Sequence, residues 1–393
     1  MTSFSDITTF AVGGEIKDFQ DCKSTKSFVN AIKAADGKKE PLYIIGFGAN
    51  TLALDKQFSG TVIRPQTHRV KFKRHKSCNR SSNCILATAD AGVNFTDFVN
   101  HCIESSFSGL ESLIGIPGTV GAAPVQNIGA YGSELADTFF SAEVFNRKTK
   151  KIETLFKGDM QFGYRSSILK TNRDKLCVSE KIILSVSLCL EYSDTAQIKN
   201  EQLAKSLNAE VGDVYSLYDI SKELMSIRAN KGTLIDPAQR INGFNVAQKS
   251  PASESSTNNS TVNKSSQFNY DRWSAGSFFT NPIVNANKLK LLPKNAPAFK
   301  IKNNEIENSE IKNSKTNKDL YKLSAGYLIE KAGFKKGFSV SKKASLSTLN
   351  NLVLTNRGDA KSDDILKLSK TVIEGVYKKF KIKLTPEVSI LNY

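Results

Sequence analysis

Residues 109–132 read GLESLIGIPGTVGAAPVQNIGAYG. The segment holds six glycines and two prolines, and its only charged side chain is Glu111. A surface loop of this length would carry more lysine, aspartate and serine, and glycine lets the backbone approach another group closely. The segment therefore predicts a backbone wall against a flat ligand. A buried glycine-rich turn between a helix and a strand is the alternative that the local pattern leaves open.

A second glycine segment lies upstream, where residues 42–51 read LYIIGFGANT. An apolar strand runs into a loop whose backbone N–H groups can turn toward an anion, and Asn50 and Thr51 add side-chain donors. This pattern suits a pyrophosphate, although a plain tight turn fits it equally well. A nicotinamide Rossmann site needs a third glycine and a helix that starts on the loop. Residues 52–55 lead into another strand instead, which excludes that site.

The composition is that of a folded protein, with 393 residues of which 39% are hydrophobic and 24% charged. Single cores stop growing at about 250–300 residues, so two or three domains are predicted. The formal net charge of +17 suggests an anionic partner, either nucleic acid or a phosphorylated small molecule. The lysines are scattered rather than clustered with aromatic residues, which disfavours nucleic acid. The sequence has neither a long apolar run nor a signal peptide, so we expect a cytoplasmic protein.

The cysteines form no C-x-x-C pair, and the three histidines all precede the main motifs, so no metal site is expected. Their spacing leaves a Cys–His nucleophilic pair open, but buried or incidental thiols are far commoner. We assign no role to any of the six cysteines, which are Cys22, Cys78, Cys84, Cys102, Cys177 and Cys189.

Hydrophobic periodicity predicts an α+β protein. Helices are predicted at residues 27–35, 94–105, 217–228, 325–332 and 362–380. Strands are predicted at residues 42–45, 61–63, 85–91, 142–145, 182–190, 351–354 and 386–391. Two polar segments, about 238–272 and 303–318, are poor in aliphatic residues and are predicted to be disordered surface insertions.

Five motifs, in this order, resemble the UDP-N-acetylenolpyruvoylglucosamine reductase family. They are GFGAN at 46–50, GIPGTVG with QNIGAYG between 115 and 132, FGYR at 162–165, SAGSFFTNP at 274–282, and TPEV at 385–388. The resemblance covers nearly the whole chain outside the two polar segments. It implies a two-part FAD-binding domain of the vanillyl-alcohol-oxidase type, residues 1–66 and 67–205, followed by an α+β substrate-binding domain, residues 206–393.

The resemblance also implies an activity. NADPH would reduce a noncovalent FAD, and the flavin would then reduce UDP-N-acetylglucosamine enolpyruvate to UDP-N-acetylmuramate, a peptidoglycan precursor. A monomer without nucleic-acid or membrane partners is expected. One alternative is a flavin-dependent oxidase on the same scaffold, which would use oxygen to reoxidise the flavin. A basic nucleic-acid-binding protein is another, but no motif for one is present.

Three residues would carry the chemistry by motif match. Arg165 would stabilise charge on the substrate carboxylate, because a guanidinium is always charged and can fork onto a carboxylate. Ser277 would donate the proton, and Glu387, on the final apolar strand after Pro386, would assist it. The positions implied for holding the substrate are Tyr164, Lys231 and Asn281. Those implied for FAD are Gly46, Phe47, Gly48, Ala49, Asn50, Thr51, Ile116, Pro117, Gly118, Thr119, Gly121, Ala122, Ala123, Gln126, Asn127, Gly129, Ala130 and Tyr131.

Two positions depart from the family pattern. Longer members carry a tyrosine on a loop that folds over the substrate, whereas the comparable stretch 205–210 has Leu207 and no tyrosine. A second family aromatic position is Phe299 here. Both changes remove hydroxyl donors, for which Tyr192, Tyr215 or Tyr270 are the candidate replacements.

Overall fold

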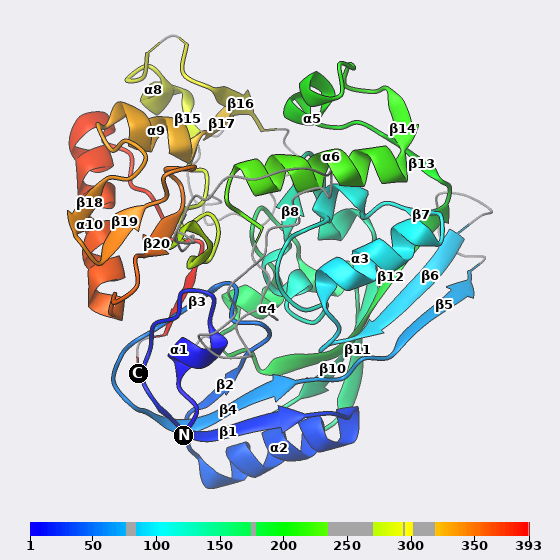
Figure 1. Cartoon of the computed structure of the whole chain (residues 1–393). Coiled ribbons are helices and arrows are strands. Elements are labelled where there is room, and N and C mark those ends of the chain that lie inside the picture. The colour runs from blue at the N-terminus through cyan, green and yellow to red at the C-terminus, as the bar shows by residue number, and fades with distance from the viewer. Residues whose placement is uncertain (76–83, 174–177, 235–269, 294, 302–318, 392) are drawn as a thin grey trace, which may run out of the picture.

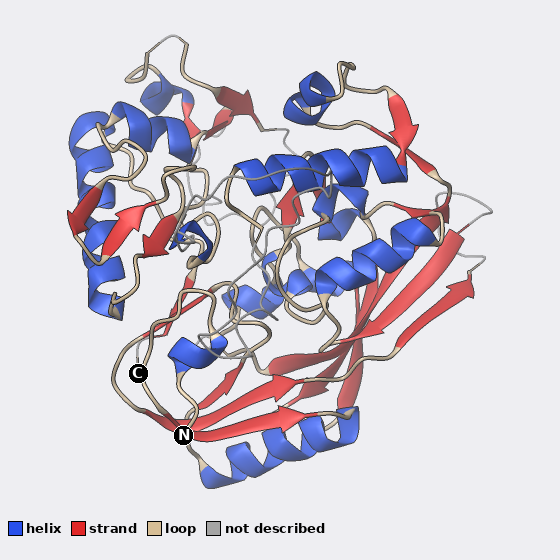
Figure 2. Ribbon diagram, in the orientation of Figure 1, coloured by secondary structure: helices blue, strands red, loops and turns tan. Residues whose placement is uncertain are grey.

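The computed structural model describes residues 1–75, 84–173, 178–234, 270–293, 295–301, 319–391 and 393 (Figure 1). Most of the polar segment 238–272 and all of 303–318 lie outside the described residues, as do Cys78 and Cys177. Helices and strands alternate along the chain, and the strands form several separate sheets (Figure 2). This arrangement confirms the α+β class. No helix in the described ranges is both long and apolar enough to cross a membrane.

The N-terminal part is built on a parallel sheet with the strand order β1-β4-β2. Its strands are β1 (Ile16–Cys22), β2 (Leu42–Ile44) and β4 (Phe58–Pro65), and α2 (Thr25–Lys38) packs along one face (Figure 1). Ser24 caps α2 by accepting a hydrogen bond from the Ser27 N–H, and Lys39 ends it in the left-handed conformation. Phe28 and Ile32 bury the inner face of α2.

A larger antiparallel sheet follows, in the order β11-β10-β12-β6-β5. Its strands are β5 (Val70–Arg74), β6 (Cys84–Asp90), β10 (Phe139–Asn146), β11 (Ile152–Phe156) and β12 (Lys181–Tyr192), and β7 (Phe107–Ser108) pairs with β12. Helices α3 (Phe95–Glu104) and α6 (Leu217–Asn230) cover one face (Figure 1). Apolar side chains of both helices join those of the sheet in one core.

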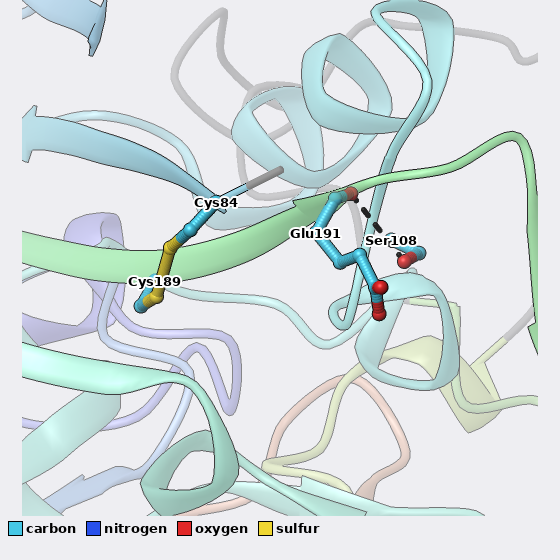
Figure 3. Close-up of a disulfide and its surroundings, with 4 residues drawn as sticks. All are labelled: Cys84, Ser108, Cys189 and Glu191. Carbon is cyan, nitrogen blue, oxygen red and sulfur yellow. Dashed lines mark hydrogen bonds between the residues drawn. A yellow bond between two sulfur atoms is a disulfide. The ribbon is translucent and has the colours of Figure 1, made fainter. Parts of the chain in front are cut away.

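A disulfide joins Cys84 on β6 to Cys189 on the neighbouring β12 (Figure 3). The two cysteines are 105 residues apart in the sequence. The antiparallel register places Cys84 opposite Glu191 and Cys189 opposite Leu86, so the sulfur atoms meet across a diagonal of the ladder. Our expectation that none of the cysteines has a role is thereby corrected for this pair, while Cys22 and Cys102 are free and buried.

The C-terminal part packs α9 (Ala325–Lys331) and α10 (Ser362–Phe380) with two antiparallel sheets. One is β15 (Ile283–Asn285), β17 (Leu320–Leu323) and β16 (Ala298–Lys300), and the other is β18 (Ser339–Ser341), β19 (Ala344–Leu346) and β20 (Leu354–Asn356). The chain then returns to its beginning, because β21 (Ser389–Leu391) pairs in parallel with β3 (Thr51–Ala53). This pairing brings the C-terminal segment to the first glycine loop.

The remaining described elements are short. They are α1 (Phe4–Ile7), α4 (Ile168–Thr171), α5 (Glu201–Ser206), α8 (Ala286–Leu289), the pairs β8 (Gly129–Ala130) with β9 (Ser133–Glu134) and β13 (Thr195–Gln197) with β14 (Val214–Ser216), and 3-10 turns at Glu111–Leu113, Ala123–Gln126, Leu135–Asp137, Lys157–Met160 and Tyr270–Arg272.

The predicted helices are confirmed, and α10 has the predicted bounds. Two predicted strands are displaced. The strand expected at 351–354 begins only at Leu354, because Asn350 accepts the N–H groups of Leu352 and Val353 and holds a turn there. The strand expected at 386–391 begins at Ser389, so Glu387 precedes it rather than lying on it.

Candidate active site

An open cavity lies along the two glycine segments. The cavity is lined by every residue expected to hold FAD from Gly46 through Gln126, whereas Asn127, Gly129, Ala130 and Tyr131 lie outside its lining. Side chains that the sequence did not single out, among them Phe28, Arg173 and Lys181, complete the wall.

Close backbone approach explains the glycines of the first loop. A Cβ atom on Gly46 would lie 2.8 Å from Oγ1 of Thr119, and Gly48 has a left-handed φ of +64°. A Cβ on Gly118, which also lines the cavity, would meet no atom within 4 Å, so this glycine opens onto free space. The two segments therefore form a cradle that fits an extended, flat cofactor such as FAD.

Asn50 ties the first loop to two distant segments. Its Nδ2 donates to Oε1 of Gln126 at 2.9 Å and to the backbone oxygen of Glu387 at 3.4 Å. The backbone N–H of Ser389 in turn donates to the Asn50 carbonyl at 3.0 Å. Both glycine segments and the C-terminal segment thus meet at one asparagine.

Arg165 and Glu387 form an ion pair beside this junction. Arg165 Nε lies 2.9 Å from Glu387 Oε1, and both side chains are largely buried. Arg165 adopts a left-handed φ of +52°, and its Nη2 donates to the Gly129 carbonyl at 2.5 Å. Burial raises the pKa of Glu387, while the charges of Arg165 and Lys170 oppose that shift. A carboxyl in this state can hold a proton at a higher pH than an exposed glutamate.

Ser277 lies on a segment next to Glu387. Its neighbour Phe278 accepts a hydrogen bond from the Glu387 N–H at 2.8 Å, and Phe278 itself is fully buried. Ser277 follows Gly276, which has a φ of +69°, and its side chain is exposed. The buried phenylalanine therefore anchors a segment whose serine is left accessible.

The aromatic ring of Tyr164 contacts two cationic side chains. The Arg165 guanidinium is 5.3 Å and the Lys322 ammonium 4.9 Å from the centre of its ring. Its hydroxyl accepts the Asn281 N–H at 3.3 Å, and burial is the main cause of its raised pKa. The Asn281 side chain is engaged elsewhere, because its Oδ1 accepts the N–H of Ala325 at the start of α9.

Lys231 lies at the end of α6, next to the ring of Tyr131. Its Nζ donates to Gln202 Oε1 at 2.6 Å and lies 5.7 Å from the ring centre. Arg228 covers the same ring at 5.3 Å, and its Nε and Nη2 have no hydrogen-bond partner in the part of the chain that the structure describes. Burial and the Arg228 charge lower the pKa of Lys231. Arg228 carried no signal in the sequence beyond its proximity to Lys231.

The positions that depart from the family pattern are also located. Leu207 ends α5, and its carbonyl accepts a hydrogen bond from the Tyr215 hydroxyl at 3.4 Å. Tyr192 and Phe299 are each 57% exposed. The Tyr270 side chain lies outside the described residues. Within the described ranges no group of three or more histidine, cysteine, aspartate or glutamate side chains could hold a metal ion.

Two family models match the chain. The FAD binding domain model matches residues 20–154, and the model for the C-terminal domain of UDP-N-acetylenolpyruvoylglucosamine reductase matches residues 267–391.

Full-length relatives and a solved structure are also similar. UDP-N-acetylenolpyruvoylglucosamine reductase of Saccharopolyspora erythraea is 31% identical over 98% of this chain and 93% of that protein. A reductase of the same name, numbered 2, from Corynebacterium glutamicum is 33% identical over 98% and 92%. The crystal structure of the Thermus caldophilus reductase covers 100% of this chain and 98% of that one, with a TM-score of 0.58 at 21% identity.

Proposed function

The chain belongs to the UDP-N-acetylenolpyruvoylglucosamine reductase family, and we propose that it uses NADPH to reduce UDP-N-acetylglucosamine enolpyruvate to UDP-N-acetylmuramate. The chain is an FAD-dependent oxidoreductase. The observation that supports the proposal most directly is the buried Arg165–Glu387 pair, because it lies at the junction of the glycine cradle and the C-terminal segment. The reaction would supply a peptidoglycan precursor.

The two glycine segments would hold FAD, which when bound takes a hydride from NADPH and delivers it to the vinyl carbon of the substrate. The backbone of the loop from Gly46 would face the pyrophosphate, and the wall from Ile116 to Ala123 would face the flavin. We propose noncovalent binding, since neither glycine segment contains a histidine or cysteine.

Arg165 would bind the substrate carboxylate. Negative charge builds toward that carboxylate when hydride reaches the vinyl carbon, and a buried guanidinium stabilises it at no cost of solvent reorganisation. Ser277 would then donate a proton to the adjacent carbon. Glu387 would support this step, because a glutamate with a raised pKa can supply or replace a proton near neutral pH.

Tyr164, Lys231 and Asn281 would hold the nucleotide sugar. Lys231 and the Lys322 ammonium that lies over the Tyr164 ring are cations suited to a diphosphate. The contribution of Asn281 would come from its backbone and from the orientation of α9, because its side-chain oxygen accepts the N–H of Ala325 at the start of that helix. We propose that residues 1–66 and 67–205 form the two FAD subdomains, that residues 206–393 form the substrate domain, and that the enzyme works in the cytoplasm as a monomer.

We expect the purified protein to be yellow and to release FAD on acid or heat treatment. Under anaerobic conditions NADPH should bleach the flavin absorbance, and UDP-N-acetylglucosamine enolpyruvate should restore it. Stopped-flow absorbance measures both steps. An oxidase would instead recover its colour with oxygen at a comparable or faster rate and would ignore the enolpyruvyl substrate. A colourless protein that takes up no FAD would contradict the proposal.

We expect Gly46→Val to weaken FAD binding by about tenfold or more, because overpacking costs about 1–3 kcal/mol. The new Cβ would lie 2.8 Å from Thr119 Oγ1, and Thr119 is buried. Fluorescence titration of the apoprotein with FAD measures the dissociation constant. Gly158→Val is the matched control, because a Cβ there meets no atom within 4 Å. Equal effects of the two variants would mean that the first loop does not touch FAD.

A further inference from the structure

Glu134 is a further carboxylate near the Arg165–Glu387 pair, on the Arg165 side. It sits on β9, directly opposite Gly129 of β8. Because Gly129 has no side chain, Glu134 and Arg165 can both approach its Cα. A Cβ at this position would be 2.9 Å from Glu134 Cγ and 3.0 Å from Arg165 Nη1. The acidic side chain and the guanidinium therefore pack against the same bare glycine.

Asn127 fixes the position of the Glu134 carboxylate. Its Nδ2 donates to Glu134 Oε2 at 2.8 Å and to the Gly163 carbonyl at 3.1 Å, and its Oδ1 accepts the Ala136 N–H at 2.9 Å. Asn127 is 1% exposed and adopts a left-handed φ of +47°. This buried amide connects the β8–β9 hairpin to the turn that leads into Arg165, so the relative position of Glu134 and Arg165 is set by buried hydrogen bonds.

Arg165 is not aligned on Glu387. Its Nε is buried and makes no hydrogen bond within the described part of the chain, although Glu387 Oε1 is only 2.9 Å away. Its Nη2 is held instead by the Gly129 carbonyl, on the Glu134 side. The guanidinium therefore pairs with Glu387 without an aligned hydrogen bond, and it lies close enough to Glu134 to act on that carboxylate through its charge.

We propose that Glu134 is a positioning residue that competes with Glu387 for the Arg165 guanidinium and so loosens the hold of Arg165 on the Glu387 carboxylate. This inference rests on the proposed function for the role of Glu387. A fully committed guanidinium would keep Glu387 ionised, whereas a shared one lets Glu387 carry a proton. Glu387 would then remain able to carry a proton for the reaction, while Arg165 stays charged and can bind the substrate carboxylate.

The charges around both carboxylates are consistent with this. Arg165 and Lys170 face Glu387, and Arg165, Lys322 and Asp137 face Glu134. Burial raises the pKa of Glu134 as it does that of Glu387, and the Asn127 hydrogen bond and the two cations oppose the shift for Glu134. The charge of Arg165 therefore acts on both carboxylates, with Lys170 adding to it at Glu387 and Lys322 at Glu134.

The test is Glu134→Gln, which keeps the shape and an acceptor for Asn127 but removes the charge. The Arg165 charge then acts on Glu387 alone, so the pKa of Glu387 falls and its protonated form is lost at lower pH. The falling limb of the pH profile for substrate reduction should move down by about one pH unit, and above that limb the rate should drop about tenfold. Below the limb, and in flavin reduction by NADPH, the rates should match the wild type.

Two further variants sharpen the test. Glu134→Asp keeps the charge and should keep the limb near its wild-type position. Glu143→Gln, which removes an exposed carboxylate on β10, should shift nothing. An unmoved or raised limb in Glu134→Gln, or an equal loss of rate at every pH, would overturn the proposal, the last because it is what a purely structural role gives.

An infrared titration decides the question without turnover. The band of a protonated carboxyl that disappears in Glu387→Gln should titrate at lower pH in Glu134→Gln than in the wild type. If the wild type proves inactive on the enolpyruvyl substrate, the proposed function fails while this titration still tests the coupling. An unchanged titration in an active enzyme would reject the role of Glu134 alone.

Discussion

Ser277→Ala should slow the reoxidation of reduced flavin by UDP-N-acetylglucosamine enolpyruvate by about 10²–10⁴-fold, the usual contribution of general acid catalysis. Reduction of the flavin by NADPH should proceed at a near wild-type rate, because that step requires no proton on the substrate carbon. Anaerobic stopped-flow absorbance of the two half-reactions separates these effects.

The position of Ser277 favours a local effect. Its neighbour Phe278 is fully buried and receives the Glu387 N–H, so the segment should keep its place when the exposed hydroxyl is removed. Substrate binding should therefore be largely retained, and the loss should appear in the rate constant rather than in the dissociation constant.

Ser339→Ala is a matched control, because it removes an exposed hydroxyl on β18. It should leave both half-reactions unchanged. Equal slowing of both half-reactions by Ser277→Ala would mean that Ser277 positions the flavin. An unchanged second half-reaction would mean that another group donates the proton.

Periodicity predicted the helices well where a long amphipathic pattern has clear ends. In α10 the apolar side chains repeat along one face from Ile365 to Phe380, and Lys381 ends the helix in the left-handed conformation. Short strands were harder, because their ends depend on tertiary hydrogen bonds. Glu387 falls outside β21 because its N–H is used by Phe278, a residue more than a hundred positions earlier.

Residues of the candidate site could be predicted from the sequence only where they belong to a motif of the family. The resemblance named Arg165 and Glu387 separately, and the fold brings them to 2.9 Å. Asn281 was named for the substrate, but in the structure its side-chain oxygen accepts the N–H of Ala325, an interaction that depends on where α9 starts. The Cys84–Cys189 disulfide follows from the register of β6 and β12, which no local pattern reveals.

Glu134 and Arg228 had no signal of their own in the sequence. Glu134 lies just beyond the glycine-rich segment 109–132 and outside the quoted motifs, and its proximity to Arg165 is seen only where both side chains pack against Gly129. Arg228 is a helix residue whose burial over Tyr131 depends on how α6 packs. In both cases the residue reaches its neighbour at the site only because segments that are separate in the sequence pack together.

Arg165→Met should lower kcat/KM for the enolpyruvyl substrate by about 10²–10³-fold, the size of effect seen when one charge-stabilising donor is removed from an active site. The variant loses the cation that would bind the substrate carboxylate and stabilise the charge that builds there. Steady-state kinetics with the enolpyruvyl substrate measure the loss. Arg165→Lys should recover only part of it, because an ammonium keeps the charge but cannot fork onto a carboxylate.

Arg69→Met is a matched control, because the Arg69 side chain is 64% exposed, pairs with Asp90 and does not line the cavity. It should leave the kinetics unchanged. A kcat/KM in Arg165→Met within a few-fold of the wild type would show that another group binds the substrate carboxylate.

The pH dependence of Arg165→Met gives the most specific prediction. Arg165 lowers the pKa of Glu387, so its removal should raise that pKa and move the falling limb for substrate reduction to higher pH. This is opposite to the shift expected for Glu134→Gln. If Glu134 acts only through the guanidinium, adding Glu134→Gln to Arg165→Met should move the limb no further. An additive downward shift in the double variant would mean that Glu134 reaches Glu387 by a route that bypasses Arg165.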